Sequence, residues 1–147
     1  MRQNVKNNLT AVFSARSENE SLARVMAAGF LLQYPVTAEE LADIKTALSE
    51  AVTNAIVHGY RDRTDGAVKV DFSLFNDGRI RITVSDRGCG IEDVARAREP
   101  FFTTDRAHER GGMGFSIMET FMDRVRVKSV PGRSTRVVLE KRLSLWK

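Results

Sequence analysis

The sequence contains 147 residues, of which 42% are hydrophobic and 29% are charged, and its formal net charge is +4. This length and composition fit one globular domain with a single core, and no apolar run approaches the ~20 residues needed to cross a membrane. One cysteine excludes an internal disulfide and a cysteine-cluster metal site, and two histidines without zinc-site spacing argue against a zinc enzyme. We therefore expect a single cytoplasmic domain over residues 1–147, because the N-terminus also lacks the apolar segment of a signal peptide.

The first part of the chain is expected to contain a strand and two capped helices. Leu9 to Ser14 is a short strand candidate. Ser17-Glu-Asn-Glu20 fits a capping box, and the helix that it opens is expected to run to about Gln33. Thr37-Ala-Glu-Glu40 is a second capping box, which starts a long helix that Gly59 is expected to end.

Three polar residues form a stripe along the second half of this long helix. Glu50, Asn54 and His58 are spaced i, i+4, i+8, so successive members drift only about 40° around the helix axis. An acid and a carboxamide at the border of a core-facing side are costly to half-bury unless something polar meets them there. The stripe is therefore either a solvated edge or part of a site. His58 also fits a simple role at the helix C-terminus, where an imidazole is favourable.

Alternation of apolar and polar residues predicts a β-hairpin in the middle of the chain. Its first strand runs from Val68 to Leu74, its turn is Asn76-Asp-Gly78, and its second strand runs from Ile80 to Val84. The second strand delivers Asp86 at its end. A short helix at most is expected between Glu92 and Arg98.

The remaining chain is expected to contain a loop, a helix and a strand pair. Residues 100–112 show no clear period and are predicted to form a loop of functional length. A helix starts at Gly114, and two strands, Arg124 to Ser129 and Thr135 to Arg142, follow it. The element order favours an α+β fold, a two-layer α/β sandwich in which helices cover one face of a mixed, mostly antiparallel sheet.

Two glycine clusters have the spacing that a nucleotide site would need. Asp86-x-Gly88-x-Gly90 follows a strand, so its carboxylate could accept a hydrogen bond from an exocyclic amine while the glycines allow close backbone approach. A turn between two elements explains this cluster equally well. Cys89, between the two glycines, is expected to be a spacer rather than a redox thiol.

The second cluster, Gly111-Gly-Met-Gly114, directly precedes a helix, where free N–H groups bind phosphate well. The preceding loop offers Thr103, Thr104 and Arg110 as donors to phosphate oxygens. The alternatives are a flexible hinge and ordinary surface residues. The cluster is neither the phosphate loop of P-loop enzymes nor a dinucleotide fingerprint, since it lacks their residues and context.

Basic residues gather near the C-terminus. Arg124, Arg126 and Lys128 alternate with valines, as on the solvent face of a strand, which leaves a solvated face or a surface for an acidic partner. No aromatic stacking residue is interleaved with them, and we therefore expect no direct nucleic-acid partner.

In combination, Glu50 with Asn54, Asp86-x-Gly88-x-Gly90, a Phe-Thr-Thr loop and Gly112-x-Gly114 resemble the N, G1 and G2 boxes of the GHKL (Bergerat) ATPases, a superfamily that includes gyrase, Hsp90, histidine kinases and MutL. Within that superfamily the chain is similar to the serine-kinase anti-sigma factors of spore-forming bacteria, and above all to the sporulation sigma-F anti-sigma factors. The runs that carry this similarity lie between Leu9 and Leu143 and include Phe13-Ser-Ala, Glu20-Ser-Leu-Ala-Arg24, Ser49-Glu-Ala-Val-Thr-Asn-Ala-Ile56, His58-Gly-Tyr60, Phe102-Thr-Thr104 and Gly112-Met-Gly-Phe-Ser-Ile-Met-Glu-Thr-Phe-Met-Asp123.

The resemblance implies a site for ATP and Mg²⁺. Glu50 would be the general base, Asn54 the Mg²⁺ ligand and Asp86 the acceptor for adenine. The positions that match other nucleotide contacts are Gly88, Gly90, Thr103, Thr104, Arg110, Gly111, Gly112, Met113, Gly114 and Thr135, the last of which follows Ser134 where the family has glycine. Glu20 and Arg24 match positions that meet partner proteins.

The function that this resemblance implies has two parts. The protein would bind and inhibit a sporulation sigma factor, and it would phosphorylate a serine of the anti-anti-sigma factor that antagonises it. A homodimer is expected, as is usual in the family. The alternatives are the related general-stress sigma-B kinase, an ATP-dependent sigma-binding module without kinase activity, and a stand-alone ATPase.

Overall fold

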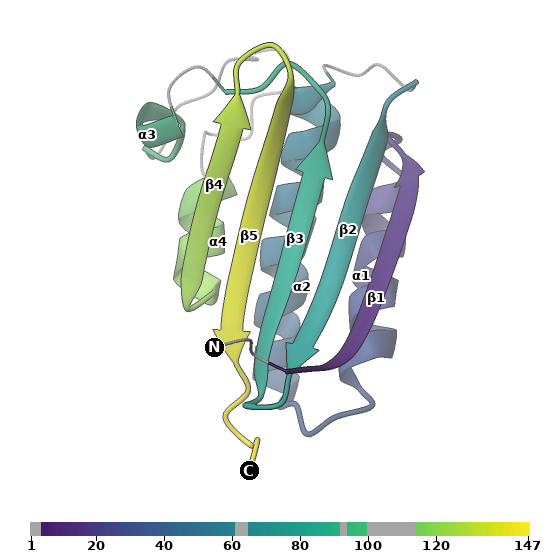
Figure 1. Cartoon of the computed structure of the whole chain (residues 1–147), viewed down its shortest axis with the longest axis vertical. Coiled ribbons are helices and arrows are strands. Elements are labelled where there is room, and N and C mark those ends of the chain that lie inside the picture. Colours follow the sequence, from purple (N-terminus) through teal and green to yellow (C-terminus); the bar gives the residue numbers. More distant parts are fainter. Residues whose placement is uncertain (1–3, 61–64, 92–93, 100–113) are drawn as a thin grey trace.

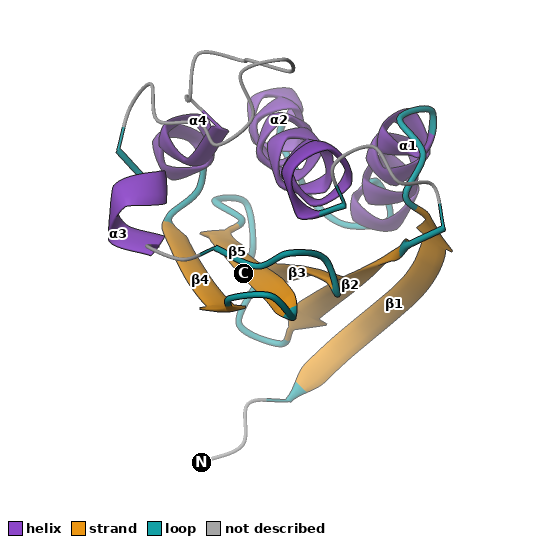
Figure 2. Ribbon diagram, turned by 90° about the horizontal axis from the view of Figure 1, so that it is seen from above, coloured by secondary structure: helices purple, strands orange, loops and turns teal. Residues whose placement is uncertain are grey.

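The computed structural model describes residues 4–60, 65–91, 94–99 and 114–147. One face of a sheet is covered by helices, and the other face carries none of the described helices (Figures 1 and 2). In chain order the elements are β1 (Val5–Ser14), α1 (Asn19–Leu31), α2 (Ala38–Thr53), the π-helix η1 (Asn54–Gly59), β2 (Ala67–Phe75), β3 (Arg79–Asp86), α3 (Val94–Ala97), α4 (Gly114–Phe121), β4 (Arg124–Val130) and β5 (Ser134–Arg142).

The strand order is β1-β2-β3-β5-β4, and each neighbouring pair is antiparallel. The predicted α+β class and helical layer are confirmed, but the sheet is antiparallel throughout rather than mixed. The reason lies in the connections, because α1 and α2 return the chain to the end of the sheet at which β1 finished (Figure 1). β2 therefore runs back alongside β1.

The core lies between the sheet and α2. Val68, Val70 and Phe72 on β2 have no exposed surface, and neither do Ile44 and Leu48 on α2. The alternation that predicted the hairpin is thus the alternation between the helix-covered face and the helix-free face of the sheet. Among the described residues, none of the helices is long and apolar enough to span a membrane.

The two predicted capping boxes have different outcomes. At α2 the box is complete, because the Glu40 N–H donates to Thr37 Oγ1 at 3.0 Å and the Thr37 N–H donates to Glu40 Oε1 at 3.0 Å. At α1 the prediction is wrong, since the N-cap is Glu18 and no side chain caps it. The Glu20 carboxylate instead contacts the Ser49 hydroxyl and pairs with Arg24 at 3.2 Å. A tertiary contact to α2 has replaced the local one.

The long helix ends at Gly59, as predicted, but its last turn is a π-helix that begins at Asn54. The Tyr60 N–H donates to the Ala55 carbonyl at 3.1 Å, which is the i→i+5 bond of a widened turn. Glu50 and Asn54 keep the predicted stripe, whereas His58 lies beyond the point at which the helical spacing changes. π-turns are often found at functional sites.

Candidate functional site

Glu50 and Asn54 meet the start of α4. A methyl group placed on Gly114 would lie 3.1 Å from Asn54 Nδ2, 3.2 Å from Asn54 Oδ1 and 3.5 Å from Glu50 Oε2. The first N–H groups of α4 lack partners within their own helix and carry partial positive charge. The two polar side chains of α2 and η1 therefore border a helix N-terminus, which is a favourable position for an anion.

A second part of the site is the buried carboxylate of Asp86 at the end of β3. Asp86 is 6% exposed, and the Gly88 N–H donates to its Oδ1 at 2.9 Å. Burial raises the pKa of Asp86 to about 6, because the hydrogen bond from Gly88 opposes this shift only in part. A buried carboxylate with one such donor retains capacity to accept a further hydrogen bond.

The glycines around Asp86 are required by close packing of the chain. A methyl group on Gly59 would lie 3.0 Å from Asp86 Oδ1, and one on Gly88 would lie 2.0 Å from the Gly59 carbonyl oxygen. The Cys89 N–H donates to that same carbonyl at 2.8 Å. Gly90 has a φ of +70°, which a side chain would strain. The end of η1 and the loop after β3 are thereby held against each other.

Thr135 is the register partner of Asp86 across β3 and β5. Both side chains are buried on the helix-covered face, and Thr135 Oγ1 lies 3.0 Å from the Ser129 hydroxyl. Ser129 Oγ also accepts a hydrogen bond from the Ile91 N–H at 2.7 Å. The serine at position 134, where a glycine was expected, does not move Thr135 away from the site.

The structure thus forms two clusters of predicted site residues. Glu50 and Asn54 lie at the start of α4. Asp86, Gly88 and Thr135 lie together at the end of β3 and the start of β5. The predicted loop residues Thr103, Thr104, Arg110, Gly111, Gly112 and Met113 lie outside the described residues. Glu20 and Arg24 lie on α1, and Glu20 contacts Ser49, which is next to Glu50 in α2.

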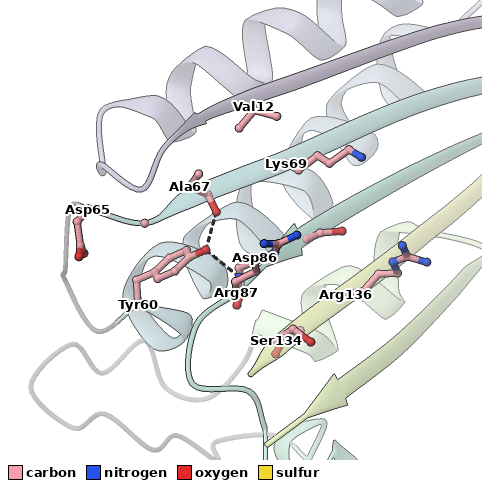
Figure 3. Close-up of a pocket in the computed structure, with 12 residues that line it drawn as sticks. Val12, Tyr60, Asp65, Ala67, Lys69, Asp86, Arg87, Ser134 and Arg136 are labelled. Atoms are coloured by element: carbon pink, nitrogen blue, oxygen red, sulfur yellow. Dashed lines mark hydrogen bonds between the residues drawn. The ribbon is translucent and has the colours of Figure 1, made fainter. Parts of the chain in front are cut away.

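The sequence interpretation missed three residues that build the site. Gly59 was assigned only to the helix end, yet it abuts Asp86 and holds the Cys89 amide. The Tyr60 hydroxyl donates to the Ala67 carbonyl at 2.6 Å and accepts from the Arg87 N–H at 2.8 Å (Figure 3). Ser129 ties β4 to the glycine loop. The His58-Gly-Tyr60 run was the available signal for the first two.

Among the described residues, no group of three or more His, Cys, Asp or Glu side chains could hold a metal ion. A Mg²⁺ ion in a nucleotide site needs few protein ligands, since waters and phosphate oxygens supply the others. The single carboxamide of Asn54, beside the α4 N-terminus, fits such a role.

Sequence and structure comparisons agree with this geometry. Residues 13–141 match the family described as the histidine kinase-like ATPase domain. The chain is 50% identical over 137 residues to the anti-sigma F factor of Clostridium novyi (93% of this chain, 95% of that protein) and 47% identical over 140 residues to that of Priestia megaterium (95% of each).

Solved structures show the same fold. The RsbU and RsbW domains of Rv1364c from Mycobacterium tuberculosis match with a TM-score of 0.69 and 25% identity, over 94% of this chain and 33% of that longer chain. The catalytic domain of histidine kinase ThkA matches with a TM-score of 0.57 over 92% of this chain and 96% of that chain, and at 16% identity it supports the fold alone. A family match over residues 13–141, together with relatives near half identity, identifies the chain as a member of the histidine kinase-like ATPase family, in the branch of the anti-sigma F factors.

Proposed function

We propose that this protein is an anti-sigma factor and an ATP-dependent protein-serine kinase. It would bind and inhibit a sporulation sigma factor of the sigma-F type and phosphorylate a serine of the anti-anti-sigma factor that opposes it. The names of the relatives support the first activity. The observation that carries the second is the placement of Glu50 and Asn54 at the N-terminus of α4, with the buried Asp86 at the opposite end.

ATP would lie between these two ends. Asp86 would accept a hydrogen bond from the adenine amine, with Gly88, Gly90 and Thr135 around the base. The triphosphate would meet the N–H groups at Gly114, and the carboxamide oxygen of Asn54 would hold Mg²⁺. Mg²⁺ would supply neutralisation of the phosphate charge. Thr103, Thr104, Arg110, Gly111, Gly112 and Met113 stay predicted contacts to the phosphates.

Glu50 would act as the general base. It is one helical turn from Asn54, and its carboxylate would accept the proton of the acceptor serine as the γ-phosphoryl group passes to the serine oxygen. The products would be ADP and a phosphoserine on the partner. A partner so modified would no longer compete for the kinase, and the sigma factor would stay bound.

The partner proteins would dock on α1 around Glu20 and Arg24. The Arg24 side chain is 44% exposed, and it stands among the exposed apolar side chains of Leu22 and Val25. An ion pair with exposed apolar neighbours is typical of a protein contact. We further propose that the protein acts as a homodimer in the cytoplasm, where its sigma factor would meet RNA polymerase.

Incubation with γ-³²P-ATP, Mg²⁺ and candidate anti-anti-sigma proteins tests the kinase activity. We expect label on a serine of the acceptor with wild type and no label with Glu50→Gln, while nucleotide and sigma binding are equal in both. Unchanged transfer by Glu50→Gln would reject the base assignment. Sigma binding without any transfer would favour the binding module, and ADP release without an acceptor would favour the stand-alone ATPase.

A further inference from the structure

A groove of about 690 Å³ opens along the helix-free face of the sheet and reaches Asp86 and Thr135 at the strand ends, but its basic lining residues have no role in the proposed nucleotide chemistry. Its lining includes Val12, Lys69, Ser85, Arg87, Ser134 and Arg136 (Figure 3). The strand register places Val12 beside Lys69, Lys69 beside Ser85 and Ser85 beside Arg136. Lys128 on β4 is the register partner of Arg136, so these side chains form a row across the strands.

The row lies on the helix-free face because its members alternate with core residues. Val68 and Val70 flank Lys69 and are fully buried, and Val137 next to Arg136 is 3% exposed. Neighbouring strands are ~4.8 Å apart, so the row from β2 to β4 spans about 14 Å. Lys69 and Arg136 lie on the strands on either side of β3 (Figure 3). Ser85 on β3 is the register partner of both and supplies a hydroxyl between them.

The cations in and beside this groove carry more positive charge than the described part of the fold neutralises. Lys69, Arg87, Lys128 and Arg136 are all exposed, and among the described residues the three besides Lys69 form no ion pair. Lys69 interacts electrostatically with Asp71, whose carboxylate is already hydrogen-bonded by the Thr10 hydroxyl at 2.6 Å. We name four residues the basic row: Lys69, Arg136 and Lys128, which follow the strand register, and Arg87, which lies directly after β3.

The other half of the same face shows the opposite arrangement. Glu140 is 5% exposed and pairs with Arg79 at 3.0 Å, with Arg126 at 2.5 Å and with Arg81 at 3.8 Å. The guanidinium groups of Arg79 and Arg81 also lie over the Phe75 ring. Three arginines there form ion pairs with one buried carboxylate of the protein itself. The basic row, in contrast, exposes its positive charge to solvent.

We propose that the basic row docks an acidic segment of a partner protein, with Ser85 and Ser134 donating further hydrogen bonds to its carboxylates. Charge complementarity selects the ligand. The groove is lined by three cations, Lys69, Arg87 and Arg136, and Lys128 lies beside Arg136, whereas its two acids are Asp65 and the buried Asp86. Single-stranded nucleic acid would need exposed rings for its bases, and the one aromatic residue of the lining, Tyr60, is 4% exposed. This surface goes beyond the proposed function. Its cations are exposed on the helix-free face, whereas the side chains of Asp86 and Thr135 are buried on the helix-covered face.

The test uses a labelled octapeptide of alternating glutamate and serine as the probe. Fluorescence anisotropy at 50 mM and 300 mM salt should show binding that weakens at the higher salt. The double variant Lys69→Glu with Arg136→Glu should lower the affinity at least tenfold, and Lys128→Gln should lower it about threefold.

Arg124→Glu is the matched control, because Arg124 is exposed on the same face and the same strand as Lys128 but about 13 Å along it. We expect this control to bind the probe like wild type. All variants should bind ATP as wild type does. A loss of peptide binding can then be distinguished from a loss of nucleotide binding.

Four outcomes would overturn the proposal. The first is that the peptide does not bind at 50 mM salt, and the second is that Arg124→Glu lowers peptide affinity as much as the double variant does. The third is that oligo-dT binds at the same residues more tightly than the peptide. The fourth is a changed sedimentation coefficient of the double variant, which would assign the basic row to contacts between copies of the protein. Circular dichroism melting of each variant checks that the fold is intact. The neutral pair Lys69→Gln with Arg136→Gln should show an intermediate loss if charge is the cause.

Discussion

Asp86 and Glu140 are two buried carboxylates on neighbouring strands with contrasting surroundings. Glu140, 5% exposed, is enclosed by three arginines on the helix-free face. Asp86, 6% exposed on the helix-covered face, accepts a hydrogen bond from the Gly88 amide and has no ion pair among the described residues. A buried charge is costly unless it is paired. Glu140 is satisfied by the fold, whereas Asp86 keeps acceptor capacity, which we propose that the adenine amine uses.

The largest expected effect is on nucleotide binding. Asp86→Ala should weaken ATP affinity about 100-fold, because a hydrogen bond to a charged acceptor contributes ~1.5–3 kcal/mol. Glu140→Gln should leave this affinity unchanged. Isothermal titration with both variants makes the comparison direct, and equal losses would show that Asp86 has no special role.

The second effect is on stability and its pH dependence. The pKa of Asp86 is raised from 3.8 to about 6, so ionisation of the folded protein is penalised by on the order of 2–3 kcal/mol above pH 6. Asp86→Asn should therefore stabilise the ligand-free protein at pH 7.5.

The sign follows from the raised pKa, because the stability that Asp86 contributes is present below pH 3.8 and is lost as the pH rises towards 6. The advantage of Asp86→Asn in urea unfolding should shrink between pH 6 and pH 4. A constant advantage across this range would contradict the raised pKa.

The third effect belongs to Glu140. Glu140→Gln should cost about 1–3 kcal/mol, because three guanidinium groups lose their shared anion but remain partly exposed to water. Guanidinium chloride unfolding measures it. Arg142→Gln is a suitable control, since its pair with Asp77 is exposed and should contribute less than about 0.5 kcal/mol.

The smallest effect concerns a third buried carboxylate, Glu40, which N–H groups rather than cations satisfy. Burial opposes ionisation, yet hydrogen bonds from Ser144 and Thr37 hold the pKa of Glu40 below its usual value. Glu40→Gln should cost ~1 kcal/mol at pH 7, and this loss should disappear as the pH falls well below the usual glutamate pKa of 4.5. Ser17→Ala, at the box that does not form, should change thermal stability by less than about 0.3 kcal/mol, and a loss as large as that of Glu40→Gln would contradict the observed cap.

The fold class was predictable because hydrophobic alternation and the Thr37 capping box are local signals. The capping box predicted from Ser17 to Glu20 does not form, because a tertiary contact of Glu20 to Ser49 replaces the local hydrogen bond. The antiparallel register that sets Thr135 beside Asp86 joins residues far apart in sequence, and so does the contact of Gly59 with Asp86. Motif resemblance placed the first of these pairs in one site, whereas periodicity alone could not have done so.

A structure with bound ADP and Mg²⁺ tests the central claim most directly. We predict that the adenine amine lies within hydrogen-bonding distance of the Asp86 carboxylate and that the phosphates lie at the N-terminus of α4, beside Asn54 and Glu50. A nucleotide bound elsewhere, or an adenine that does not meet Asp86, would contradict the account.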